Sequence, residues 1–133
     1  MTAKILIVDD EEDIRRTLAL LLGDDYEVLC AGGGEEALRT LAREQPEVML
    51  LDITMPGLSG LDVLAVKAEA APKTTVVMLT SKADIEFAQR ALQLGAVSYV
   101  TKPFDHDFLR EEIARILKAA SGEEDPYRPW RTE

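Results

Sequence analysis

The chain contains very little cysteine and histidine, with one residue of each among 133. A single cysteine excludes an internal disulfide and a metal cluster built on thiolates. Cys30 lies in the apolar stretch from Tyr26 to Ala31, where we expect a buried and unreactive thiol. His106, the one histidine, falls at the expected start of the last helix, so a phosphohistidine carrier is a poor hypothesis.

Positive charge is also scarce, with 15 Lys and Arg against 25 Asp and Glu and a net charge of −10. Because neutralisation of phosphates supplies most nucleic-acid affinity, we expect that this unit does not bind DNA by itself. No apolar run approaches the roughly 18 residues of a membrane span, and no signal region precedes the first acidic residues. These absences predict a cytoplasmic protein with no membrane segment.

At 133 residues the chain is expected to form one globular unit. Its apolar periodicity stops at Ser121, and two prolines follow within the last residues. We therefore expect a domain over residues 1–120 and a tail or linker over residues 121–133. Tyr127 and Trp130 in that tail either pack on the domain or dock elsewhere.

Short apolar runs alternate with stretches of helical spacing along the whole domain. Continuous runs of branched residues are typical of strands buried on both faces, and strict alternation favours a parallel sheet with right-handed crossovers. We expect an α/β fold, flavodoxin-like and doubly wound, with a five-stranded parallel sheet in the order 2-1-3-4-5 and five helices on both faces. The expected strands include residues 5–8, 28–29, 48–51, 76–79 and 97–100, and the helices include 14–22, 38–42, 61–68, 85–92 and 109–117.

Several residues predict where helices begin and end. Ser59 followed by Asp62 has the spacing of a capping box. Asp84 and Asp105 stand where two further helices should start, and Gly23 and Gly95 stand where helices should end. The glycines at 32–34 predict a turn, because the remaining residues of a phosphate-binding loop are missing.

Polar residues follow four of the expected strands. In an open α/β sheet the carboxyl ends of the strands form the ligand site, so these residues should converge. Three neighbouring carboxylates repel one another unless a cation joins them or one is protonated, and oxygen ligands favour Mg²⁺. The residues are Asp9 and Asp10 after the first strand, Asp52 at the third, Thr80 at the fourth, and Thr101, Lys102 and Pro103 at the fifth.

Lys102 and Thr80 complete a chemical set around the carboxylates. An ammonium group would hold an anion opposite the metal, and a hydroxyl would donate a hydrogen bond to it. Such a set is typical of a phosphoryl group carried on a carboxylate nucleophile. Any one Asp at a strand end is commonly just a turn former, so the interpretation depends on the combination.

Four motifs carry a resemblance to a known family: Ile-Leu-Ile-Val-Asp-Asp-Glu-Glu (5–12), Leu-Leu-Asp-Ile-Thr-Met-Pro-Gly-Leu-Ser-Gly-Leu-Asp (50–62), Leu-Thr-Ser (79–81) and Tyr-Val-Thr-Lys-Pro-Phe (99–104). They closely resemble the receiver domain of two-component response regulators, over about residues 3–120. The resemblance implies phosphorelay signalling in which a histidine kinase or phosphotransfer protein phosphorylates Asp52.

The resemblance also implies a role for each remaining site residue. Lys102 would contact the phosphoryl oxygens and precede a cis proline. Thr80 would reorient toward the phosphoryl group, and Tyr99 would swing inward in response. Mg²⁺ would be held by Asp9, Asp10, Asp52 and the main-chain carbonyl of Thr54.

Members of this family are not enzymes in the usual sense, apart from slow self-dephosphorylation. The resemblance places Thr54 and Lys82 beside the path of the attacking water, at positions that tune this hydrolysis. Lys82 then either covers the phosphoryl group as a cationic lid or points into water as an ordinary surface charge.

Some features leave the subfamily open. Many DNA-binding members carry an acidic pair before the aromatic residue of the fifth strand, used in a symmetric dimer, and residues 95–99 lack it. We therefore expect either a monomer or a phosphorylation-dependent homodimer. No effector domain follows residue 120, so the chain is either a stand-alone receiver with an unknown output protein or a fragment.

Three alternative functions are weighed against the receiver hypothesis. An aspartate-nucleophile phosphatase would carry Asp-x-Asp and an inserted cap, whereas this chain has Asp9-Asp10-Glu11-Glu12. A flavin-binding module of the same sheet order would meet an acidic edge that repels the cofactor phosphate. A degenerate receiver-like binding module would lack part of the acid, Thr and Lys set, which is complete here.

Overall fold

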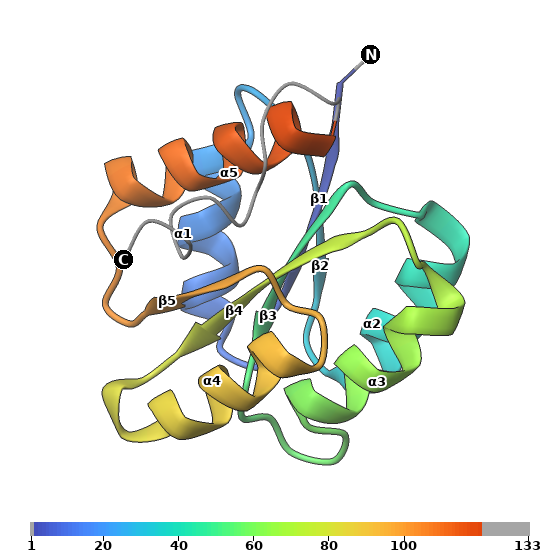
Figure 1. Cartoon of the computed structure of the whole chain (residues 1–133). Helices are drawn as coiled ribbons and strands as arrows, with labels where there is room; N and C mark the ends of the chain where they lie inside the picture. The colour runs from blue at the N-terminus through green and yellow to red at the C-terminus, as the bar shows by residue number, and fades with distance from the viewer. Residues whose placement is uncertain (1, 121–133) are drawn as a thin grey trace.

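Five parallel strands form one sheet in the order β2-β1-β3-β4-β5, which confirms the doubly wound α/β prediction (Figure 1). The computed structural model describes residues 2–120. The expected tail, with Tyr127 and Trp130, lies outside the described residues. The elements are β1 (Lys4–Val8), α1 (Glu12–Leu22), β2 (Glu27–Ala31), α2 (Gly34–Glu44), β3 (Val48–Asp52), α3 (Gly60–Ala70), β4 (Thr75–Thr80), the 3₁₀ turn η1 (Lys82–Asp84), α4 (Ile85–Gln93), β5 (Ser98–Thr101) and α5 (His106–Ala120).

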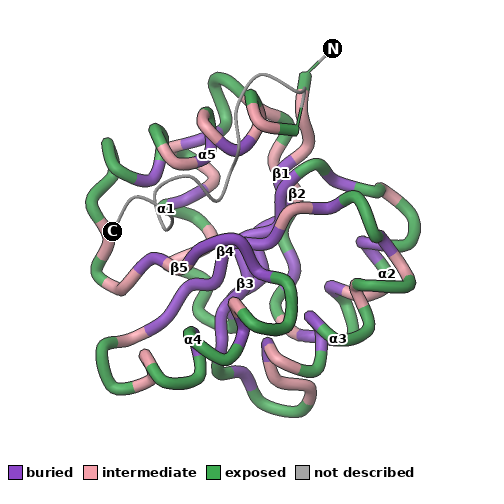
Figure 2. The backbone as a smooth tube through the Cα atoms, in the orientation of Figure 1, coloured by how far each residue is buried: buried purple, intermediate pink, exposed green. Residues whose placement is uncertain are grey.

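The sheet has a buried hydrophobic layer on each face, with α1 and α5 on one side and α2, α3 and α4 on the other. Successive strand residues point to opposite faces. Leu6 and Met49 therefore pack on the α2, α3 and α4 side, while Ile5 and Leu50 pack on the α1 and α5 side. The central strands are buried along their length (Figure 2), which explains their continuous apolar runs.

β2 lies at the edge of the sheet and is only partly covered. Cys30 in this strand is exposed, so the prediction of a buried thiol was wrong. The apolar neighbours of Cys30 in sequence indicate a strand, but an edge strand has a sheet neighbour on one side only.

The capping signals around the site loops are largely confirmed. Ser59 Oγ accepts a hydrogen bond from the Asp62 N–H at 3.3 Å, and the Asp62 carboxylate accepts one from the Ser59 N–H at 3.1 Å. Asp105 accepts a hydrogen bond from the Phe108 N–H at 2.9 Å, at the start of α5. Asp84 does precede α4, but its carboxylate makes no capping hydrogen bond.

Gly60 allows α3 to begin directly against the end of β3. A Cβ at this position would collide with the Asp52 carbonyl oxygen and would lie 2.9 Å from Ile53 Cα. The Gly60 N–H donates a hydrogen bond to the Ile53 carbonyl at 3.0 Å. The absence of a side chain at residue 60 therefore helps to define the backbone that carries Asp52.

Within residues 2–120, the helices are all too short or too polar to cross a membrane.

Candidate functional site

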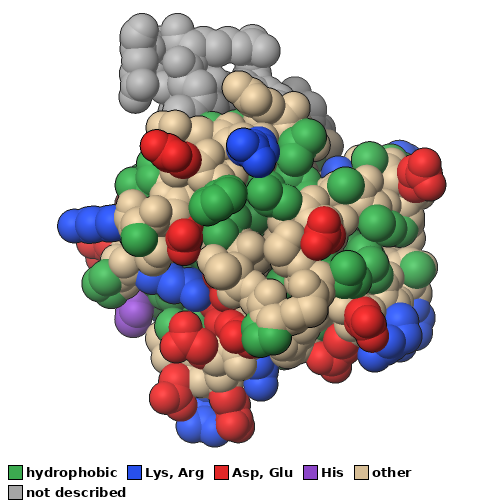
Figure 3. Space-filling model, turned by 90° about the horizontal axis from the view of Figure 1, so that it is seen from below, with side chains coloured by type: hydrophobic (Ala, Val, Ile, Leu, Met, Phe, Trp, Pro, Cys, Tyr) green, Lys and Arg blue, Asp and Glu red, His purple; other side chains and the backbone are tan. Residues whose placement is uncertain are grey.

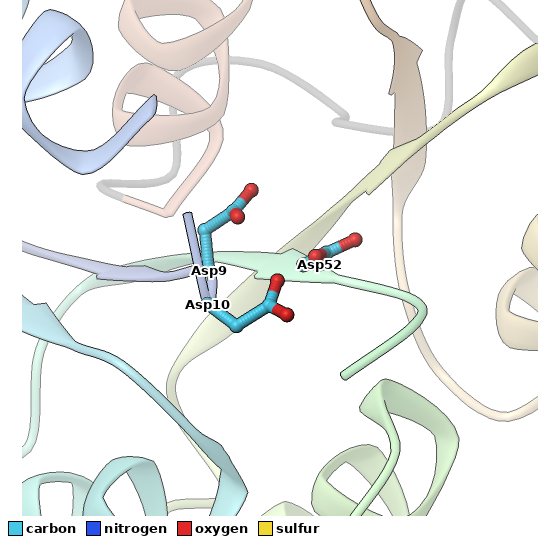
Figure 4. Close-up of side chains that lie close together, drawn as sticks. All are labelled: Asp9, Asp10 and Asp52. Carbon is cyan, nitrogen blue, oxygen red and sulfur yellow. The ribbon is translucent and has the colours of Figure 1, made fainter. Parts of the chain in front are cut away.

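Three carboxylates meet at the carboxyl ends of β1 and β3, as the sequence predicts (Figure 4). One oxygen each from Asp9, Asp10 and Asp52 lies within 4.8 Å of the others. Asp9 and Asp52 are buried, whereas Asp10 is exposed. The parallel sheet therefore brings together residues that are more than forty positions apart in the chain.

Lys102, which follows β5, reaches across the sheet to this carboxylate cluster. Its Nζ lies 2.7 Å from Asp9 Oδ2 and 3.5 Å from Asp52 Oδ1. Burial lowers the pKa of Lys102, but the hydrogen bond to Asp9 and the charges of Asp52 and Asp9 outweigh this effect and leave it raised. Lys102 is therefore a protonated, half-buried cation beside Asp52. The Lys102–Pro103 peptide bond is cis, as the resemblance implied.

The environment of Asp52 disfavours its negative charge. Burial and the neighbouring Asp9 carboxylate raise the pKa of Asp52 from 3.8 to about 6, although Lys102 and the Thr54 N–H act in the opposite direction. The Thr54 N–H lies 3.3 Å from Asp52 Oδ1. One lysine thus compensates the carboxylate cluster only in part, and a divalent cation would supply the missing positive charge.

The donor atoms of the cluster fit a hard cation. All three are carboxylate oxygens, the ligands that Mg²⁺ prefers, and one of them comes from an exposed side chain.

Figure 3 shows the molecule from below the view of Figure 1, where acidic side chains gather together with Lys and Arg side chains on part of the surface.

A pocket of about 350 Å³ opens beside Asp52. Four of its lining residues are predicted site residues, and the other three were missed. The missed residues follow predicted site residues closely in sequence, in the loops after β1 and β4. The pocket is lined by Asp10, Glu11, Asp52, Thr54, Ser81, Asp84 and Lys102, and Glu11, Ser81 and Asp84 are the three that were missed.

Thr80 and Tyr99 lie on the neighbouring strands β4 and β5. Thr80 is buried, and its Oγ1 donates a hydrogen bond to the Ser81 carbonyl at 3.0 Å. Tyr99 is half-buried and packs against the core layer on the α2, α3 and α4 side. The hydroxyl of Thr80, at the end of β4, is therefore bonded to the carbonyl of the next residue.

Asp84 has the sequence position of a helix cap, which gives no indication that its carboxylate belongs to the site. Its Oδ2 accepts hydrogen bonds from Ser81 Oγ at 2.9 Å and from Thr54 Oγ1 at 3.2 Å. Lys82 is exposed, and it is absent from the described residues that line the pocket. Whether Lys82 covers the phosphoryl group or stays a surface charge remains a prediction about the phosphorylated protein.

The family model for the response regulator receiver domain matches residues 5–114. Regulatory protein AtoC of Escherichia coli is 40% identical to this chain, over 91% of the chain and 27% of that protein. Sporulation initiation phosphotransferase F of Bacillus subtilis is 32% identical, over 91% of the chain and 98% of that protein.

Solved structures agree with this match. The crystal structure of a response regulator receiver domain protein from Clostridium thermocellum aligns with a TM-score of 0.85 and 34% identity, over 90% of this chain and 97% of that one. The chain thus spans nearly the whole of some relatives and about a quarter of others.

Proposed function

Because this chain belongs to the family of response regulator receiver domains, which serve in phosphoacceptor signalling, we propose that Asp52 is its phosphoacceptor. The observation that carries this proposal is the position of Asp52 at the end of β3, with a carboxylate oxygen 3.5 Å from Lys102 Nζ. The pocket on which Asp52 opens gives a phosphodonor access to this carboxylate.

In the proposed reaction, an Asp52 carboxylate oxygen attacks the phosphorus atom of a phosphohistidine. The bond from phosphorus to the imidazole nitrogen breaks, and its electron pair remains on the nitrogen. Lys102 is placed to bind the transferring phosphoryl oxygens, where its charge offsets the developing negative charge. Asp9 holds Lys102 in position through the hydrogen bond of 2.7 Å.

Receiver domains bind Mg²⁺ in an acidic pocket, and we assign that role here to Asp9, Asp10, Asp52 and the main-chain carbonyl of Thr54. When bound, Mg²⁺ would neutralise the carboxylates and the phosphoryl oxygens together. The proximity of the three carboxylate oxygens and the raised pKa of Asp52 support this assignment.

Receiver domains interact with histidine kinases, and we propose a histidine kinase or a phosphotransfer protein as the donor for this chain. Relatives such as AtoC are much longer than this chain. We therefore propose a phosphodonor and do not name an output protein or effector domain. A monomer or a phosphorylation-dependent homodimer is compatible with the proposal. Family membership gives no support to the flavin or phosphatase alternatives.

The test is phosphorylation with Mg²⁺ and either acetyl phosphate or a phosphorylated kinase. The wild type should gain one acid-stable, base-labile acyl phosphate, and Asp52→Asn should gain none, because an amide is not a nucleophile. Asp107→Asn makes the same change of charge at an exposed position in α5 and should be labelled normally. Equal labelling of Asp52→Asn would overturn the assignment.

Asp10→Ala should weaken Mg²⁺ binding rather than remove the acceptor. Raising the Mg²⁺ concentration should therefore restore part of the labelling of this variant, but none of the labelling of Asp52→Asn.

A further inference from the structure

Asp84 is anchored in the wall of the phosphoacceptor pocket through one of its two carboxylate oxygens. Thr54 Oγ1 and Ser81 Oγ both donate to Oδ2, at 3.2 and 2.9 Å. Among the described residues, none donates a hydrogen bond to Oδ1. One oxygen thus orients the carboxylate, and the other is free to accept a hydrogen bond from water.

The anchoring residues tie Asp84 to the ends of two adjacent strands. Thr54 follows β3, and its N–H lies 3.3 Å from Asp52 Oδ1, so one residue bridges the two carboxylates. Ser81 follows β4 directly. β3 and β4 are paired, so the two segments that leave them start side by side, and the hydrogen bonds from Thr54 and Ser81 hold Asp84 between these segments.

The other groups in the pocket wall are occupied differently. Asp10 belongs to the carboxylate cluster, and Glu11 Oε1 lies 3.8 Å from Lys102 Nζ. The hydroxyls of Thr54 and Ser81 donate hydrogen bonds to Asp84. Asp84 is therefore the carboxylate of the described pocket that pairs with neither the lysine nor the cluster.

We propose that Asp84 is the general base for hydrolysis of the aspartyl phosphate, an inference that rests on the proposed role of Asp52. A water oxygen attacks the phosphorus atom while a proton of that water passes to Asp84 Oδ1. The bond from phosphorus to the Asp52 oxygen breaks, and its electron pair returns to the Asp52 carboxylate. The products are inorganic phosphate and free Asp52, and Asp84 loses its proton to solvent.

The matched variants are Asp84→Asn and Glu86→Gln. In Asp84→Asn the amide oxygen takes the anchored place, because both hydroxyls donate there. The NH₂ group then replaces Oδ1 and cannot accept a hydrogen bond from water. Glu86 is exposed in α4 and does not line the pocket, so Glu86→Gln removes one negative charge without removing the base.

The measurement is decay of the phosphorylated protein after removal of the donor, at constant Mg²⁺ concentration. Asp84→Asn should decay at least about fivefold more slowly than the wild type, since positioned bases commonly contribute more than this factor. Glu86→Gln should decay at the wild-type rate. The rate ratio between water and deuterium oxide should fall in Asp84→Asn, because proton transfer to the base is lost.

A second variant separates base catalysis from simple positioning. Asp84→Ala should also decay slowly, and added formate should accelerate it, because a free carboxylate can occupy the vacated space. Formate should leave the wild type unchanged. A change in loop position alone would not respond to formate.

Two sets of results would overturn the role of Asp84. One is normal labelling of Asp84→Asn with wild-type or faster decay. The other is slow decay of Asp84→Ala without rescue by formate. Both leave Asp52 as the phosphoacceptor, whereas labelling of Asp52→Asn, or no labelling of the wild type, would mean that the proposed function is wrong.

Discussion

At the scale of single residues, Asp52 links the proposed reactivity to the stability of the fold. Burial and the Asp9 carboxylate raise the pKa of this carboxyl from its ordinary value of 3.8 to about 6 in the folded, metal-free protein. Between these pH values the folded protein retains a proton that the unfolded chain has lost. The free energy of unfolding therefore decreases as the pH rises through this interval, and it stays lower above it.

Asp52→Asn should therefore stabilise the Mg²⁺-free protein at about pH 8 by about 1–3 kcal/mol, since one pKa unit corresponds to about 1.4 kcal/mol. The gain should narrow toward about pH 5, where the wild-type carboxyl is largely protonated in the folded state. Urea unfolding of both proteins at about pH 8 and about pH 5 measures this difference in the free energy of unfolding. Mg²⁺ should stabilise the wild type more than the variant.

The exposed Asp107→Asn serves as the control for a general change in net charge. It should show no comparable gain at either pH. Equal stability of Asp52→Asn and the wild type at the higher pH would contradict the burial effect assigned to Asp52.

At the scale of elements, the start of α3 positions the loop that carries Asp52. Gly60→Ala should destabilise the protein by about 1–3 kcal/mol, because the new methyl group meets backbone atoms of residues 52 and 53 that cannot move independently. Phosphorylation of the variant should also slow, since relief of the clash displaces the Asp52 backbone. Thermal unfolding and the labelling rate measure the two effects.

Gly33→Ala is the matched control for this substitution. A Cβ at Gly33 would meet no atom within 4 Å, and its φ of −169° is extended backbone that any residue adopts. This variant should keep wild-type labelling and lose about 0.5–1 kcal/mol of stability, because alanine is a poorer N-cap than glycine. Similar losses of stability in the two variants would contradict the role assigned to the close approach at Gly60.

The strands β4 and β5 carry the proposed switch between Thr80 and Tyr99. Phosphorylation adds about −2 charge beside Thr80, whose hydroxyl can then leave the Ser81 carbonyl and donate to a phosphoryl oxygen. The phosphoryl group can only redistribute states that it contacts differently. Thr80→Ala should accept phosphate but lose most of the NMR shift change at Tyr99.

Thr17→Ala, an exposed threonine substitution in α1, is the control and should preserve the response of Tyr99. If Thr80→Ala shows the same shift change at Tyr99 as the wild type, the two residues are not coupled through the hydroxyl.

At the scale of the whole molecule, the net charge of −10 opposes binding to a polyanion. Residues 1–133 should therefore give no sequence-dependent shift of duplex DNA in a gel at physiological salt. A family member with a DNA-binding domain serves as the positive control. A shift that depends on the DNA sequence would contradict this prediction.

Much of the site could be predicted because the same residues determine both the fold and its carboxyl edge. Asp9, Asp10 and Asp52 directly follow or end apolar strand runs, so their convergence follows from a parallel sheet. Asp84 could not be placed in this way. Its sequence position is typical of a residue that caps a helix. Only the folded structure shows that its carboxylate accepts hydrogen bonds from Thr54 and Ser81.

The sequence by itself determined the alternation of strands and helices, and with it the edge where the polar residues gather. These properties depend on local periodicity and on the general geometry of parallel sheets. Only the tertiary structure decided that Cys30 is exposed and that Asp84 faces the pocket. Burial and hydrogen-bond partners depend on which segments lie beside a residue in space, and for these two residues the sequence neighbours do not contain that information.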